Sequence, residues 1–280
     1  FVGIAGCCNG LAAAGTVAVI MAGWSSNNKF ALLAAFRAVA QLVSYEVPMV
    51  LALLVPVLLS GSMSTQEIVR QQHIWYVFAV PLTVLIFLIS SQAENGRGPF
   101  DLLEAESELV SGFHIEYSGM KFGMFYVAEF LHAFTVGVLT AILFLGGWKG
   151  PFAEDVAILG FFYLMIKSLF AYWVLVWVRM TLPRVRIDHL LDFNWKFLVP
   201  VGLMNLLVVA FVWKLIPGTD EINSFGDAVV PTLALLLVNV AMVLVIGALL
   251  ADRGRRERAR IEARVAGADL PVETVAGAGD

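Results

Sequence analysis

Long apolar stretches that recur along the chain constrain its fold more than any other feature. Each holds about 20 residues with few charges, the length at which an α-helix crosses the hydrocarbon core of a bilayer. Hydrophobic residues make up 60% of the sequence, and the mean hydropathy is +0.84. The stretches do not divide into ten-residue segments of alternating polarity, which would indicate a membrane β-barrel. We therefore expect an all-α polytopic membrane protein. The predicted transmembrane helices, about seven, lie near residues 1–22, 38–60, 73–92, 122–147, 156–179, 193–214 and 229–251.

Lysine and arginine are distributed unequally between the segments that connect these spans. One set of segments holds most of them, whereas the opposite set holds only Arg70, Lys149 and Lys214. Because orientation follows the count of Lys and Arg rather than net charge, the richer set is expected in the cytoplasm. This predicts one transmembrane domain over residues 1–251, multi-pass in the inner (plasma) membrane. The polar interval 93–121 and the basic to disordered tail 252–280 are then both cytoplasmic.

The start of the chain shows no signal of secretion or of metal binding. Phe1 opens an apolar stretch without a basic segment before it, which favours a membrane span whose preceding sequence is missing over a signal peptide. Cys7 and Cys8 are adjacent in that stretch, with no His or Cys at the spacing of a metal site. We expect packing residues here, and no cofactor bound by this chain.

The interval 93–121, AENGRGPFDLLEAESELVSGFHIEYSGMK, is the only long polar stretch between the predicted spans. Pro99, Asp101 and Glu104 have the spacing of a helix start with a capping box. Crowding and partial burial raise carboxyl pKa values, so such acids are suited to exchanging protons near neutral pH. The alternative is a solvated acidic loop. The charged residues of the interval are Glu94, Asp101, Glu104, Glu106, Glu108 and Glu116, with Arg97 and Lys121.

Charged residues also occur inside the predicted spans, where they are costly and usually serve a pathway. Glu46 and Lys167 are such residues, and an interior carboxylate partner is expected for Lys167, with Glu129 as one candidate. Glu129 and His132 are three residues apart and share a helix face, so they could pass a proton along or bond to each other.

Three segments resemble a known family. Residues 93–130 closely resemble the signature loop of the H subunit of NADH:quinone oxidoreductase, respiratory complex I. GWSSNNKFALLAAFRAVAQLVSYEVP and WVRMTLPRVRIDHLLDFNWKFLVP resemble further parts of the same family. The resemblance covers about residues 1–215 and implies nothing firm for the span 229–251. The family begins with further helices that this sequence lacks, so the resemblance implies an N-terminally truncated chain.

The resemblance implies a subunit of the membrane arm, in contact with other membrane-arm and peripheral-arm subunits, the latter carrying FMN and iron–sulfur clusters. Quinone is the implied substrate, and no nucleic acid is expected as a partner. The loops that match 23–37, 93–121 and 179–196 would help form the quinone chamber. The implied proton-coupling residues are Glu46, Glu94, Asp101, Glu104, Glu106, Glu108, Glu116, Glu129 and Lys167. The implied quinone-chamber or interface residues are Arg37, Tyr45, Arg97, Arg179 and Arg184.

Three other interpretations remain open. The chain could be the equivalent subunit of a membrane-bound hydrogenase or formate hydrogenlyase complex. A secondary transporter would use Glu46, Glu129 and Lys167 to bind an ion at the midplane, but no pair of Gly/Pro-broken half-helices lies at corresponding positions of two halves. A pure scaffold would leave Glu46 and Lys167 unexplained.

Overall fold

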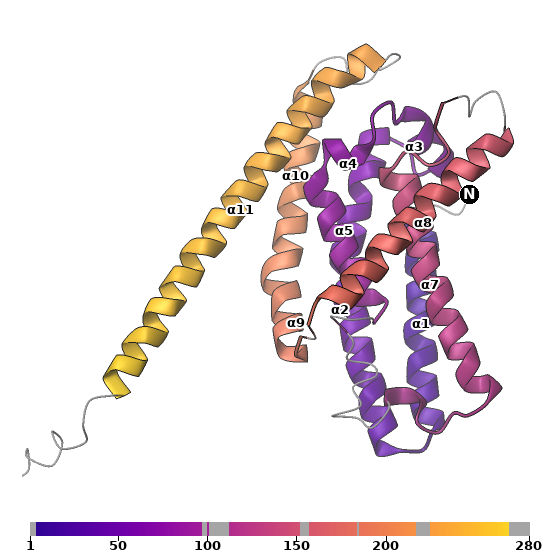
Figure 1. Ribbon diagram of the computed structural model, residues 1–280, viewed down its shortest axis with the longest axis vertical. Helices are drawn as coiled ribbons and strands as arrows, with labels where there is room; N and C mark the ends of the chain where they lie inside the picture. The colour runs from indigo at the N-terminus through magenta and orange to yellow at the C-terminus, as the bar shows by residue number, and fades with distance from the viewer. Residues whose placement is uncertain are drawn as a thin grey trace, which may run out of the picture.

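A computed structural model describes residues 4–96, 100, 112–151, 157–183, 185–216 and 225–268, and every regular element within these ranges is helical (Figure 1). The elements are α1 (Ile4–Ser25), α2 (Lys29–Ser60), α3 (Thr65–Gln71), α4 (Tyr76–Ala79), α5 (Pro81–Glu94), η1 (Gly112–His114), α7 (Met120–Phe144), α8 (Ala157–Thr181), α9 (Ile187–Phe193), η2 (Asn194–Leu198), α10 (Val199–Leu215) and α11 (Phe225–Ala268).

Within the part of the chain that the structure describes, five stretches are long and apolar enough to cross a membrane, which confirms the predicted polytopic all-α fold. They are Lys29–Ser60, Met120–Phe144, Ile158–Thr181, Asp188–Leu215 and Val229–Ala248. Two further predicted spans, 1–22 and 73–92, coincide largely with α1 and with α4 and α5, which are shorter or only partly described.

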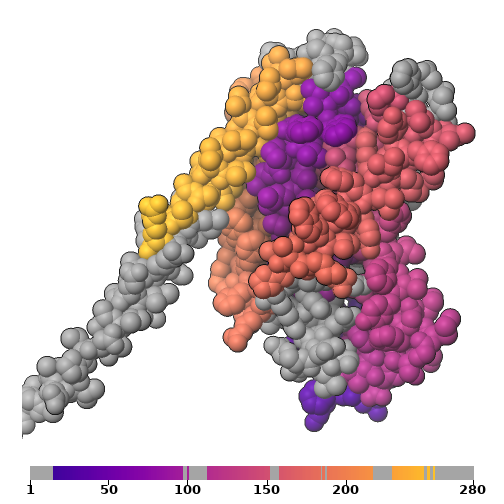
Figure 2. All heavy atoms as spheres, viewed as in Figure 1, coloured from indigo at the N-terminus to yellow at the C-terminus, as the bar shows by residue number. Residues whose placement is uncertain are grey.

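α2 is the central helix of the bundle. It packs against α1 on one side and against α5 and α10 on the other, while α7 pairs with α8 (Figure 1). Asn28 caps its start, because the side-chain oxygen accepts a hydrogen bond from the Phe30 N–H at 3.1 Å. The first part of α11 lies against α10 and α4 (Figure 2), and the helix then extends away from the body of the protein toward its C-terminal end (Figure 1).

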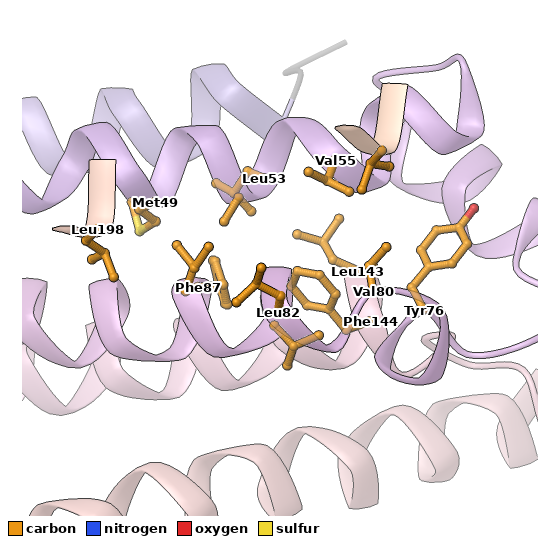
Figure 3. Packing of buried hydrophobic residues seen from close by; sticks show 14 of the residues in the cluster. Met49, Leu53, Val55, Tyr76, Val80, Leu82, Phe87, Leu143, Phe144 and Leu198 are labelled. Atoms are coloured by element: carbon orange, nitrogen blue, oxygen red, sulfur yellow. The ribbon is translucent and has the colours of Figure 1, made fainter. Parts of the chain in front are cut away.

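Small residues allow the helices to approach closely. A Cβ added to Gly23 in α1 would lie 2.5 Å from the Cβ of Ala35 in α2, and one added to Gly137 in α7 would lie 3.0 Å from the Ser168 carbonyl oxygen in α8. Lipid tails are as apolar as the helix surfaces, so the hydrophobic effect does not drive membrane helices together. Close packing at small residues does so instead. Between α2 and α5 the space is filled by larger side chains, among them Met49 and Phe87 (Figure 3).

A proline inside α2 explains one contact between distant segments. Pro48 has no N–H, so the carbonyl of Ser44, four residues earlier, lacks its donor within the helix. The side-chain amide of Asn194 donates to that carbonyl oxygen at 2.7 Å. One residue on, the Tyr45 hydroxyl donates to the Leu190 carbonyl oxygen at 3.0 Å. The π-helical segment η2 and the preceding α9 therefore hold the turn of α2 that carries Glu46.

Replacing Asn194 by Ala should lower the free energy of unfolding by about 1 kcal/mol, because the buried Ser44 carbonyl loses its donor. In a Pro48→Ala background the new N–H at position 48 can bond Ser44, so Asn194→Ala should cost less there. Apparent melting temperatures of the four proteins in lipid nanodiscs form a double-mutant cycle. Strictly additive effects would contradict the assigned contact.

Candidate functional site

A cavity of about 480 Å³ lies between α1, α2, α5, η1 and α7, and it collects titratable side chains from four of these elements. Glu46 comes from α2, Glu94 from α5, and Glu129 and His132 from α7, while His114 belongs to η1. The fold therefore brings three carboxyl groups and two imidazoles to one cavity from segments that lie far apart in the sequence.

The rest of the cavity wall is mostly apolar. An aromatic cluster covers one side. The ring centroids of Phe113 and Phe125 are 5.5 Å apart. The ring centroid of His114 lies 5.2 Å from that of Phe122 and 6.5 Å from that of Tyr126. These edge and tilted contacts fix the position of the His114 ring. The apolar wall limits hydration of the carboxyl groups, so a negative charge is costly there. Other lining residues include Thr16, Val19, Leu42, Asn95, Leu131 and Thr135.

Glu94 is held at the cavity by the backbone around it. It is the last residue of α5 and follows the predicted span 73–92. Gln41, fully buried in α2, donates through its amide to the carbonyl oxygens of Ala93 at 2.7 Å and Phe100 at 2.9 Å, so it clamps the chain on both sides of Glu94. Burial, and to a lesser extent the nearby Glu46 carboxylate, raise the pKa of Glu94 to about 7.

The contact of Glu94 with His132 was not found from the sequence. The distance from Glu94 Oε1 to His132 Nε2 is 3.9 Å, and the two residues lie on different helices. Helix spacing predicted His132 only as a neighbour of Glu129 on one helix face. No local signal indicates that the end of α5 meets the middle of α7, and none identifies His114 as a cavity residue.

Glu116 lies at a different place from the cavity. Its carboxylate accepts a hydrogen bond from the Asn28 amide at 3.2 Å, and it lines a second pocket of about 470 Å³ together with Lys121 and Tyr117. The Tyr117 hydroxyl donates to the Ala22 carbonyl oxygen at 3.1 Å. These contacts join the α1–α2 connection to the segment before α7, at the same end of the bundle.

The remaining predicted residues fall into two groups. Tyr45 is buried beside Phe100 with ring centroids 5.9 Å apart, Arg37 is half-buried in α2, and Arg179 is half-buried in the last turn of α8. The others lie outside the described residues. They are Arg97, Asp101, Glu104, Glu106, Glu108 and Arg184.

Among the described residues, the structure does not pair Lys167 with the expected membrane carboxylate. The Lys167 ammonium donates to three backbone carbonyl oxygens, those of Leu145 at 2.8 Å, Gly147 at 3.1 Å and Lys149 at 2.8 Å. These follow the end of α7, where the helix dipole favours a cation. Glu129 lies in the first half of α7, roughly 24 Å along the helix axis from Leu145. Backbone oxygens thus take the place of the expected carboxylate.

Comparison with known proteins finds a family and several relatives that match most of the chain. The NADH dehydrogenase family matches residues 7–210. The H subunit of NADH-quinone oxidoreductase from Dehalococcoides mccartyi is 45% identical over 222 residues, which is 79% of this chain and 62% of that protein. The H subunit from Geobacillus kaustophilus is 50% identical, over 70% of this chain and 59% of that protein. The H subunit from Geobacillus thermodenitrificans is 49% identical, over 71% of this chain and 60% of that protein. The chain thus spans about 60% of the length of these curated relatives.

The raised pKa of Glu94 predicts a pH-dependent stability. The folded chain holds this proton more tightly than the unfolded chain, so its stabilising contribution is present below about pH 4.5 and is lost as the pH rises through about 7. Glu94→Gln removes this loss. The free energy of unfolding of the variant minus that of the wild type should be roughly 2–3 kcal/mol larger at pH 8 than at pH 5. Apparent melting temperatures in nanodiscs test this, and a difference that is constant from pH 5 to 8 would contradict it.

Removing the Lys167 ammonium should destabilise the junction of α7 and α8. Lys167→Met leaves three carbonyls without their charged donor, so we expect a loss of about 2 kcal/mol. Lys29→Met, at an exposed lysine, should change stability little. Because the two sites are far apart, the effects of Lys167→Met and Glu129→Gln should add. A large coupling between them in thermal unfolding would restore the carboxylate pairing.

Proposed function

Because the chain belongs to the NADH dehydrogenase family, whose curated relatives are named as the H subunit of NADH-quinone oxidoreductase, we propose that it is a membrane component of such a complex. In this proposal it helps form the quinone chamber and couples quinone reduction to proton translocation. It binds no redox cofactor itself, because FMN and the iron–sulfur clusters belong to partner subunits. Other membrane-arm and peripheral-arm subunits are its partners.

The observation that carries this proposal is the convergence of Glu46, Glu94 and Glu129 on one largely apolar cavity. Burial and the nearby Glu46 carboxylate raise the pKa of Glu94 to about 7, so this group is suited to taking up and releasing a proton near neutral pH. A new charge at about 10 Å, such as that of a reduced quinone, contributes about 1.7 kcal/mol at an effective dielectric constant of about 20. That energy is about one pKa unit, sufficient to change which carboxyl group holds a proton.

The quinone chamber is proposed at the cytoplasmic end of the bundle, formed by segments 23–37, 93–121 and 179–196. Contacts between the α1–α2 connection and the segment before α7 support a common location for the first two. The hydrogen bond from Tyr45 to the Leu190 carbonyl oxygen joins α2 to the third. Arg37 and Arg179 are the described cations proposed for this region, where a planar guanidinium favours bidentate contacts.

The inner membrane location and the cytoplasmic position of the acidic interval and the C-terminus remain part of the proposal, supported by the distribution of Lys and Arg. An equivalent subunit of a membrane-bound hydrogenase or formate hydrogenlyase complex would use the same cavity chemistry. The transporter alternative is weaker, because the Lys167 ammonium is occupied by three carbonyls far from Glu129.

The proposal predicts that neutralising the carboxyl groups impairs quinone reduction and proton translocation but not the entry of electrons from NADH. In the assembled complex, Glu46→Gln, and separately the pair Glu104→Gln with Glu108→Gln, should leave electron transfer from NADH to a hydrophilic artificial acceptor intact. Quinone reduction and proton translocation should both fall, by about tenfold or more, because a group that cannot titrate cannot pass a proton. Glu67→Gln, at an acid in α3 outside the cavity, is the matched control.

Quinone reduction and proton translocation decide the outcome, both normalised to assembled complex by the artificial-acceptor rate. Normal proton translocation in both carboxyl variants would overturn the coupling role. An equal loss in the Glu67→Gln control would show that the effect does not depend on the cavity.

A further inference from the structure

His132 occupies a position between two carboxyl groups of the cavity. It faces Glu94 across the gap between α7 and α5, with 3.9 Å from Nε2 to Oε1, and it shares a face of α7 with Glu129, three residues earlier. Both Glu94 and Glu129 line the same cavity as the imidazole. The imidazole therefore has one carboxyl neighbour on another helix and one on its own.

The polar atoms at this contact are incompletely bonded among the described residues. His132 Nε2 and Glu94 Oε2 are buried and have no hydrogen-bond partner there. Buried polar atoms are usually satisfied, so such a pair requires an explanation. A separation of 3.9 Å is too long for a direct hydrogen bond but is closed by one water molecule or by a side-chain movement of about 1 Å. This geometry suits a contact that forms and breaks rather than a fixed structural bond.

Imidazole differs from every other neutral group in the cavity in what it can do with a proton. One ring nitrogen accepts while the other donates, and both steps are accessible near neutral pH. An amide or hydroxyl at the same position could accept and donate hydrogen bonds but would not take up a proton. The other titratable groups that line the cavity are Glu46 from α2, His114 from η1 and Tyr126 from α7.

We propose that the imidazole of His132 relays protons between Glu94 and Glu129. The protonated carboxyl of Glu94 gives its proton to one ring nitrogen, and the other ring nitrogen gives its proton to the Glu129 carboxylate. One proton is transferred, no electrons move, and rotation or tautomer exchange of the neutral ring restores the starting state. The inference rests on the proposed function. It assigns the transfer of protons between two carboxyl groups to an imidazole, which is not one of the acidic residues.

The test compares three variants in the assembled complex: His132→Gln, His132→Ala and Glu94→Gln. His73→Gln, at a histidine that follows α3 outside the cavity, serves as the control. The rate of proton translocation during reduction of quinone by NADH is measured, with the artificial-acceptor rate as the measure of assembled complex. We expect all three cavity variants to lose translocation, His132→Gln by about tenfold or more, and the control to retain it.

Added imidazole separates a relay from a structural role. It should raise translocation in His132→Ala, where a small base can enter the space left by the ring, whereas pyrrole, which lacks a basic nitrogen, should not. A loss in both His132 variants without imidazole rescue would overturn the relay and indicate a packing role. Wild-type translocation in His132→Gln with loss in Glu94→Gln would overturn the relay but keep the proposed function. Wild-type translocation in both would overturn the proposed function and the relay together.

Discussion

The cost of placing charge inside an apolar helix bundle is the constraint on which this structure depends. An isolated carboxylate away from water is so unfavourable that it retains its proton or finds partners. Here Glu46, Glu94 and Glu129, which enter from three helices, meet in one cavity instead of occupying three separate sites. The nearby Glu46 carboxylate raises the free energy of ionising Glu94, so these two groups interact across the cavity.

Several other interior polar groups bond to backbone carbonyls rather than to charged side chains. Gln41 bonds two carbonyls around Glu94, Asn194 bonds the Ser44 carbonyl that Pro48 leaves without a donor, and Lys167 bonds three carbonyls beyond α7. Each contact joins segments distant in sequence. Together they hold α2, α5 and α7 in the register that brings the carboxyl groups together, without adding a cation that would keep those groups ionised.

Sequence predicted the helical membrane fold well, because apolar runs of span length have few alternative structures. It also identified Glu46 and Glu129, since a charge inside an apolar run is conspicuous. It did not predict the contact of Glu94 with His132, because helix periodicity defines faces within one helix and not which helices meet. For a related reason it did not predict the contacts that Lys167 makes among the described residues: backbone carbonyls occur at every residue and leave no signature in the sequence.

Infrared difference spectroscopy of the assembled complex, recorded between the oxidised and the NADH-reduced state with quinone present, tests the central claim most directly. We predict a change in the carboxylic acid C=O stretching region, since protons redistribute among the cavity carboxyl groups when quinone is reduced. Glu94→Gln should remove or shift part of this signal. A spectrum without carboxyl changes, or one identical in the wild type and the variant, would contradict a role of this cavity in proton transfer.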